Sequence, residues 1–131
     1  MGSQEKSIRT FKTDNAPAPG GHYSQAVIHN NTIYLSGQLP VNPFTGEKVT
    51  GDIEIQTRQV LENIRVILKD AGSDLSRVIK ATVYISDISL WGKVNEVYSG
   101  FFGSHKPARS VVPTRDLHYG LLVEMEVIAA L

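Results

Sequence analysis

Apolar residues recur with the 3.6-residue period of an α-helix in two segments of the chain. The first follows Asp52, a residue type that caps helix N-termini, and runs to about Asp70, with Gly72 as a suitable stop. Its apolar face consists of Val60, Ile64, Ile67, Leu68 and Ala71. The second follows Ser89 as its cap and ends before Gly103, with a stripe of Leu90, Val94, Val97 and Phe101. The aromatic residues that flank this stripe, and that we expect in the core, are Trp91, Tyr98 and Phe102.

Six other segments have the composition or the alternation that is typical of β-strands. They cover residues 7–11, 23–29, 32–36, 78–85, 107–113 and 121–129. The pair Asn30-Asn31 suits a tight turn between the second and the third. In segment 78–85 the pattern places Ile79, Ala81, Val83 and Ile85 on one face of the strand, and Lys80, Thr82 and Tyr84 on the other face.

This order of elements predicts an α+β fold of two layers, with a mixed sheet and both helices on one face, because each strand–helix–strand connection is right-handed. We expect one domain over residues 1–131, with residues 1–6 as a flexible N-terminus. The far face of the sheet has no helix left to cover it, although it includes Ile128 beside Glu124 and Glu126. We therefore expect a homo-oligomer that buries this face against another subunit.

The composition narrows the classes of function. The formal net charge of zero argues against an overall attraction to nucleic acid or to an anionic membrane. The absence of cysteine excludes disulfides, thiolate metal sites and cysteine nucleophiles. The four histidines lack metal-ligand spacing, so we expect no metal site. Without a signal peptide or an apolar run of about 20 residues, the protein is expected to be cytoplasmic.

An arginine and two glutamates stand in the last two strand segments, where packed side chains are expected. If these segments pair antiparallel with Val112 opposite Leu121, Arg109 stands directly opposite Glu124. One interpretation is a structural ion pair at a subunit contact. The other is that the planar guanidinium of Arg109 binds the carboxylate of a small ligand, with Glu124 orienting the guanidinium or a water molecule. The pattern leaves both open.

Six short motifs, in this order, resemble the RidA/YjgF family over about residues 15–131. They are Tyr23-Ser24-Gln25-Ala26, Ser36-Gly37-Gln38-Leu39-Pro40, Asn42-Pro43 with Thr45-Gly46-Glu47, Asn95-Glu96-Val97-Tyr98, Pro107-Ala108-Arg109-Ser110 and the stretch Val123-Glu124-Met125-Glu126-Val127-Ile128-Ala129. The resemblance implies a chorismate-mutase-like fold and a homotrimer with ligand clefts between subunits. It also implies hydrolysis of reactive 2-imino and enamine acids, such as 2-iminobutanoate and 2-iminopropanoate, to 2-oxo acids and ammonia, without a metal or an organic cofactor.

The resemblance also assigns roles to residues of this chain. Arg109 would bind the substrate carboxylate, and Glu124 would position the attacking water. Gly37 would let the backbone approach the site closely, and the backbone N–H of Val111 would be a further contact for the carboxylate. The residues that would line the cleft are Tyr23, Ser36 and Asn95.

Three positions depart from the family pattern: Val111 replaces a frequent cysteine, and His118 and His22 each replace a frequent proline. Val111 argues against a thiol switch, and His118 with Tyr119 is expected to alter one wall of the cleft. Two alternatives to the deaminase stay open. One is a metabolite-binding regulatory module that uses Arg109 for recognition alone. The other is an RNA-directed translation inhibitor, which zero net charge disfavours.

Overall fold

The computed structural model describes residues 7–131, so the prediction for residues 1–6 lies outside the described residues. The strands are β1 (Arg9–Phe11), β2 (Ala26–His29), β3 (Thr32–Leu35), β4 (Val78–Ile85), β5 (Ala108–Pro113) and β6 (Val123–Ala130). The helices are α1 (Ile53–Asp70) and α2 (Trp91–Phe102), with short 3₁₀ turns η1 (Leu75–Arg77), η2 (Ile88–Leu90) and η3 (His118–Gly120).

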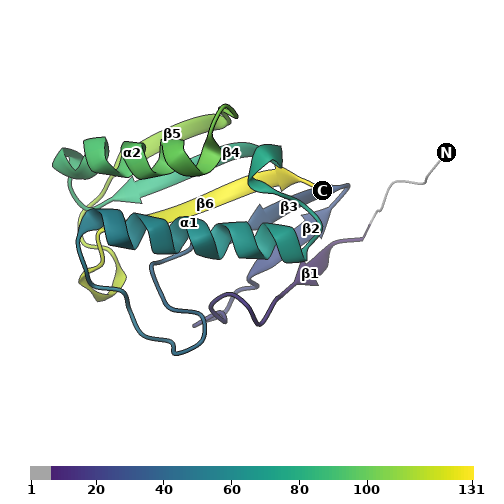
Figure 1. Cartoon of the computed structure of the whole chain (residues 1–131). Coiled ribbons are helices and arrows are strands. Elements are labelled where there is room, and N and C mark those ends of the chain that lie inside the picture. The colour runs from purple at the N-terminus through teal and green to yellow at the C-terminus, as the bar shows by residue number, and fades with distance from the viewer. Residues whose placement is uncertain (1–6) are drawn as a thin grey trace.

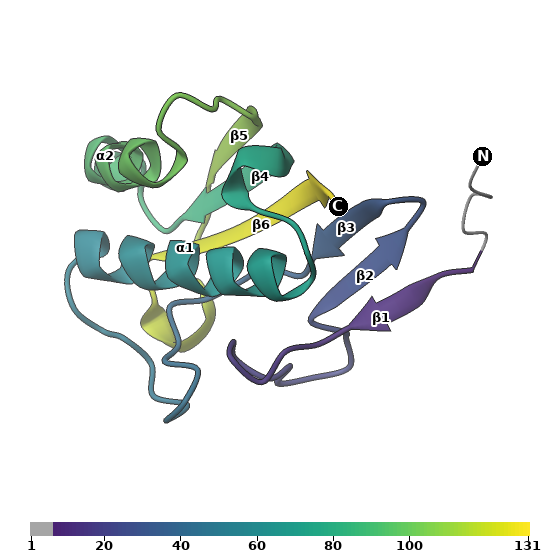
Figure 2. The same ribbon diagram turned by 45° about the vertical axis from the view of Figure 1, so that its right-hand side comes forward.

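The six strands form one mixed sheet in the order β1-β2-β3-β6-β4-β5. Only β4 and β5 run parallel, as the crossover through α2 requires, and the other neighbours are antiparallel. Both helices lie on the same face of the sheet (Figure 1). The turned view in Figure 2 shows α1 along β6 and α2 beside β4 and β5. The predicted α+β fold is confirmed.

Helix α1 agrees with the helix that the sequence predicted between Asp52 and about Asp70. The Asp52 carboxylate accepts a hydrogen bond from the backbone N–H of Ile55 at 3.0 Å, as an N-cap does. At the other end, Gly72 has φ +90°, a conformation that favours glycine. The fully buried apolar residues of the helix are Val60, Leu61, Ile64, Ile67 and Leu68.

The core fills the space between the two helices and the sheet. From the sheet it takes Ala81, Val83, Ile85, Val123, Met125, Val127 and Ala129, and from α2 it takes Val94, Val97, Tyr98 and Phe102. Full burial of one Val, Leu, Ile, Phe or Met side chain stabilises a fold by about 1.5–3 kcal/mol. The alternation of buried and half-buried residues along β6 fixes which side chains point away from the helices.

Strand β4 departs from the predicted alternation at its first residues. Val78 is buried, whereas Ile79 is 51% exposed, so the assignment of Ile79 to the same face as the buried residues Ala81, Val83 and Ile85 is wrong. The register shifts between Val78 and Lys80 as a β-bulge. A bulge inserts one extra residue, which reverses the facing of the side chains before it.

The start of α2 also differs from the prediction. Ser89 lies inside the turn η2 and does not cap the helix. Instead, the Asp87 carboxylate accepts a hydrogen bond from the backbone N–H of Ser89 at 2.8 Å. The helical region therefore begins with a 3₁₀ turn, a common lead-in to an α-helix.

The face of the sheet away from the helices carries Glu124, Glu126 and Ile128, all half-buried. The hydroxyl of Tyr84 donates to the Glu126 carboxylate across this face at 2.6 Å. Tyr34, the register partner of Ile128, is 45% exposed beside it. Neither helix covers this face, as the pattern predicted, and its burial against another subunit stays a prediction.

Candidate functional site

Arg109 and Glu124 are not neighbours in this chain, because β4 lies between β5 and β6. Arg109 is the register partner of Ala81, and Glu124 is the register partner of Tyr84. The antiparallel pairing with Val112 opposite Leu121 is therefore wrong. The crossover through α2 lays β5 parallel to β4 on one side, and β6 occupies the other side of β4.

The two residues also lie on opposite faces of the sheet. Directly paired residues point to the same face, and Ala81 is fully buried beneath the helices, so Arg109 points to the helix layer. Tyr84 lies on the other face, and Glu124 lies there with it. One copy of the chain thus presents the predicted carboxylate-binding group and the predicted water-positioning group in two separate places.

The guanidinium of Arg109 is held by one face of α2. Its Nη1 donates to Oδ1 of Asn95 at 3.0 Å. The guanidinium carbon lies 4.5 Å from the centroid of the Trp91 ring and 4.9 Å from that of Tyr98. Trp91, Asn95 and Tyr98 follow at spacings of four and three residues, which places them together on a helix. Since guanidinium carries five N–H donors, the contact with Asn95 leaves others for a ligand.

Sequence reasoning placed Trp91 and Tyr98 in the core and missed their contact with Arg109. Tyr98 is 5% exposed, and its hydroxyl is the one buried side-chain N or O atom without a hydrogen-bond partner in residues 7–131. Burial raises the pKa of this hydroxyl, and the nearby guanidinium of Arg109 opposes the rise through its charge and through a contact too poorly aligned to count as a hydrogen bond by distance and angle. The spacing of Trp91, Asn95 and Tyr98 was the available signal, because it aligns two ring faces with a polar side chain.

Asn95, Tyr98 and Arg109 line a hollow of about 420 Å³. Val111 follows Arg109 on β5, half-buried and packed against the core. We call this region the arginine hollow. It contains Arg109 and Asn95 of the predicted site, and the backbone N–H of Val111 as a ligand contact stays a prediction.

Glu124 packs directly against Gly37. The backbone N–H of Gln38 donates to the carbonyl of Met125 at 2.8 Å, and the N–H of Met125 donates back at 3.1 Å. This pair of bonds ties the segment after β3 to β6 and places Gly37 over Glu124. A Cβ atom at position 37 would collide with the Glu124 carboxylate and lie 3.1 Å from its Cδ. Glycine at position 37 therefore permits this close approach, and a larger residue would displace the flexible end of the Glu124 side chain.

The carboxyl group of Glu124 is half-buried. Burial raises its pKa above the ordinary value, Glu126 adds to the rise, and His118 opposes it. A carboxylate with a raised pKa is a stronger base when it is ionised. Glu124 is thus prepared to accept a proton.

Glu124, Tyr23, Ser36 and Gly37 line a second hollow of about 390 Å³, which we call the glutamate hollow. The Ser36 hydroxyl donates to the carbonyl of Ser24 at 2.6 Å, which fixes its orientation. Tyr23 is 52% exposed and lies outside β2, and its hydroxyl accepts from the backbone N–H of Gly20 at 3.1 Å. The structure therefore brings four of the predicted residues together here, apart from those of the arginine hollow.

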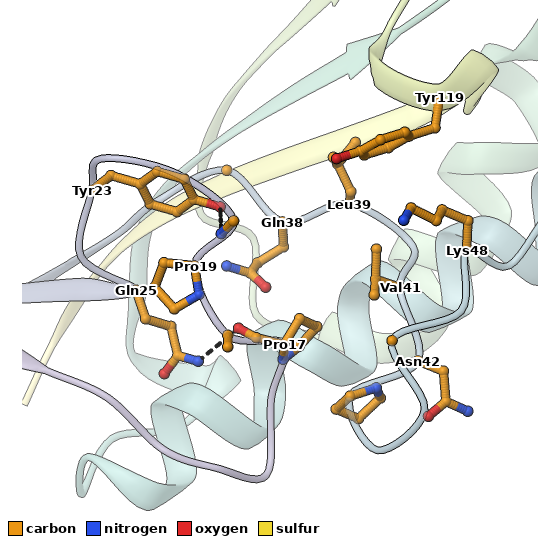
Figure 3. A pocket seen from close by; sticks show the side chains of 15 residues that line it. Pro17, Pro19, Tyr23, Gln25, Gln38, Leu39, Val41, Asn42, Lys48 and Tyr119 are labelled. Atoms are coloured by element: carbon orange, nitrogen blue, oxygen red, sulfur yellow. Dashed lines mark hydrogen bonds between the residues drawn. The ribbon is translucent and has the colours of Figure 1, made fainter.

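A third hollow, of about 330 Å³, adjoins the glutamate hollow (Figure 3). The two share Gly20, Tyr23, Gly37, Leu39 and Tyr119 as lining residues. Lys48 lines only the third hollow, and its Nζ lies 4.3 Å from the centroid of the Tyr119 ring. We call this region the lysine hollow.

No group of three or more potential metal-ligating side chains occurs within residues 7–131. In the same part of the chain, no helix combines the length and the hydropathy that a membrane span requires.

A family model described as endoribonuclease L-PSP matches residues 13–131. The chain belongs to the RidA/YjgF family. A RutC family protein of Pyrococcus horikoshii is 52% identical over 117 residues, which are 89% of this chain and 93% of that protein. A protein of Capra hircus named 2-iminobutanoate/2-iminopropanoate deaminase is 46% identical over 121 residues, 92% of this chain and 88% of that protein.

Solved structures of the RidA/YjgF family have the same fold. The crystal structure of RidA from an Antarctic Psychrobacter species matches with a TM-score of 0.90 at 41% identity, over 94% of this chain and 99% of that chain. The family membership and the fold predicted from the six motifs are thus confirmed. The residues of the predicted site stay a prediction.

Proposed function

We propose that this protein hydrolyses reactive 2-imino and enamine acids, such as 2-iminobutanoate and 2-iminopropanoate, to 2-oxo acids and ammonia. The main support for this proposal is that the guanidinium of Arg109 is fixed in position but not neutralised by a carboxylate from the described part of the same chain. No carboxylate of residues 7–131 forms an ion pair with it, although Asn95 and two aromatic rings hold its guanidinium in place. Within one copy of the chain, the guanidinium of Arg109 therefore keeps N–H donors for a ligand carboxylate. The name of the Capra hircus relative supports the same activity.

The chemistry needs little covalent help, because a protonated imine is already an electrophile. Arg109 binds the substrate carboxylate through charge-assisted hydrogen bonds and fixes the position of the imine carbon. Glu124 accepts a proton from a water molecule as its oxygen bonds to that carbon. The resulting carbinolamine takes a proton on nitrogen from Glu124. Its C–N bond then breaks, and the hydroxyl passes its proton to the departing ammonia, which leaves as ammonium and gives the 2-oxo acid.

The site is assembled from neighbouring copies of the chain in a homotrimer. The arginine hollow of one copy faces the glutamate hollow of the next, so that Arg109 and Glu124 act on one substrate. This accounts for their placement on opposite faces of the sheet, and threefold assembly provides three identical clefts. Assembly also covers the apolar residues of the far face, Tyr34 and Ile128.

The test is the release of ammonia from 2-iminobutanoate that threonine dehydratase generates in the assay. The native protein accelerates hydrolysis, and Arg109→Ala loses roughly ten- to several-hundred-fold in kcat/KM, because a hydrogen bond to a charged group contributes about 1.5–3 kcal/mol. Arg109→Lys retains an intermediate rate. Binding of 2-oxobutanoate without acceleration of imine loss would instead assign a metabolite-binding module. Salt-dependent binding of RNA would assign an RNA-directed role.

A further inference from the structure

The lysine hollow has the lining of a site for a small side chain with a distal negative charge. Its walls include the apolar residues Leu39 and Val41 and several prolines. Lys48 is the one charged side chain among the lining residues, all of which lie in the described part of the chain. No carboxylate of residues 7–131 forms an ion pair with it. A cation without a counter-ion beside an apolar hollow favours an anionic ligand group.

The position of Lys48 is fixed by the loop that precedes it. The Asn42 carboxamide accepts hydrogen bonds from the backbone N–H groups of Phe44 and Thr45 at 2.9 and 3.1 Å. The backbone N–H of Asn42 donates to the carbonyl of Glu47 at 2.8 Å and closes the turn. Lys48 follows this turn directly and pairs with Val41 as an isolated β-bridge. These hydrogen bonds and the bridge therefore fix the backbone from which the Lys48 side chain extends.

The ammonium group of Lys48 contacts the ring of Tyr119. Its ring lies over Lys48 Nζ, and its backbone has φ +60°, which is rare for a residue other than glycine. Strained backbone of this kind persists where the surroundings determine it, and it is frequent at ligand sites. Figure 3 shows the Lys48 amine directed toward the space below Tyr119 and Leu39. A cation–aromatic contact at an exposed site is weak and leaves ammonium N–H groups for a ligand.

We propose that the lysine hollow receives the side chain of the substrate and that Lys48 selects 2-imino acids with a second carboxylate at the end of that side chain. This inference rests on the proposed deaminase function. The imine carbon lies at Glu124, and the side chain passes Tyr23 and Leu39, which line both hollows. The distal carboxylate then meets the Lys48 ammonium.

The experiment compares two 2-imino acids of five carbons. An L-glutamate oxidase generates 2-iminoglutarate, which has a distal carboxylate, and an L-amino acid oxidase generates 2-iminopentanoate from norvaline, which lacks it. Competition with semicarbazide measures imine loss for each. Because Lys48 is exposed, we expect kcat/KM to favour 2-iminoglutarate by roughly two- to fivefold. Lys48→Met should remove the preference by lowering kcat/KM for 2-iminoglutarate alone. Lys48→Arg should retain the preference.

The control variant is Lys69→Met, which makes the same change in net charge at an exposed residue of α1 that lines none of the three hollows. It should keep the native preference. An equal ratio of the two rates in native protein and in Lys48→Met overturns the role of Lys48 and leaves the deaminase function intact. Absence of acceleration on any imine counts against the deaminase function itself. In that case, calorimetric binding of 2-oxoglutarate against 2-oxopentanoate, with the same variants, decides whether Lys48 recognises the carboxylate.

Discussion

The guanidinium carbon of Arg109 lies 4.5 Å from the centroid of the Trp91 ring, and this contact orients the candidate substrate-binding group. The indole belongs to the first turn of α2, whereas Arg109 belongs to the edge strand β5. The crossover between β4 and β5 thus places an aromatic ring against a side chain of the edge strand. The guanidinium is consequently held in position before any ligand arrives, which reduces the entropy lost on binding.

Replacement of Trp91 should weaken ligand binding more than it slows turnover. Trp91→Leu removes the ring face, and a contact of this kind contributes about 0.5–2 kcal/mol, so we expect KM to rise by roughly two- to thirtyfold. Trp91→Phe keeps a ring and should restore most of the affinity. Steady-state rates with 2-iminobutanoate measure both. An unchanged KM in Trp91→Leu would contradict the positioning role.

Gly37→Ala should slow turnover while the fold remains. The added methyl group collides with the Glu124 carboxylate and displaces it from the glutamate hollow. We expect kcat to fall by about tenfold or more, because general base catalysis contributes about 10²–10⁴-fold. The matched control is Gly20→Ala, which lines the same hollow and has no atom near the added methyl group. Comparable losses in both variants would show that the effect does not act through Glu124.

Two tyrosines should respond in opposite ways to loss of the hydroxyl group. The buried hydroxyl of Tyr98 has no partner within residues 7–131, so Tyr98→Phe should leave the free energy of unfolding unchanged or raise it by about 1 kcal/mol. The hydroxyl of Tyr84 donates to Glu126, so Tyr84→Phe should lower it by about the same amount. Thermal or denaturant unfolding of the two variants measures the difference. A marked loss of stability in Tyr98→Phe would reveal a partner for that hydroxyl.

The pH dependence of activity should report the ionisation of Glu124. Since burial raises its pKa, the acid limb of kcat/KM should have its midpoint above the ordinary value of a glutamate. Glu124→Gln should lose the activity and this limb together. Rates measured between pH 4 and 8, corrected for spontaneous hydrolysis of the imine, test this. A midpoint at or below the ordinary value would show that the charge of Arg109 from the neighbouring copy outweighs the burial of Glu124.

The same group affects stability with a defined sign. A carboxyl group whose pKa is raised in the folded protein binds its proton more tightly there than in the unfolded chain. Its contribution therefore favours folding at low pH and is lost as the pH rises through the raised pKa. Glu124→Gln should thus be at least as stable as the native protein at neutral pH, as denaturant unfolding can measure. A strong loss of stability would mean that the ionised carboxylate supports the fold.

The sequence predicted those parts of the fold that follow from local periodicity. Helix α1, its cap at Asp52 and the alternation along β6 all agree with the structure. The start of β4 could not be read in this way, because the bulge that exposes Ile79 depends on pairing with β6. The strand order was also beyond local pattern. The position of β4 between β5 and β6 depends on the crossover through α2 and on pairing between segments that are far apart in the sequence.

For the candidate site, the family motifs singled out residues that the structure brings into contact, and their roles stay a prediction. Gly37 and Glu124 do meet, and Asn95 does bond to Arg109. The contacts of Trp91 with Arg109 and of Lys48 with Tyr119 were missed, because an aromatic residue on an apolar helix and a lysine after a turn have ordinary structural explanations. Their contacts became visible only once the positions of α2 and of the loop before Lys48 were known.

The most direct test of the account is complementation between two inactive variants. Arg109→Ala and Glu124→Gln are each purified, unfolded, mixed in equal amounts and refolded together, and deamination of 2-iminobutanoate is measured. If each cleft takes Arg109 from one copy and Glu124 from its neighbour, random assembly restores both groups in roughly a quarter of the clefts. About this fraction of the native rate should therefore return. A mixture that stays as inactive as the separate variants, although it refolds into the native oligomer, would contradict a site shared between copies.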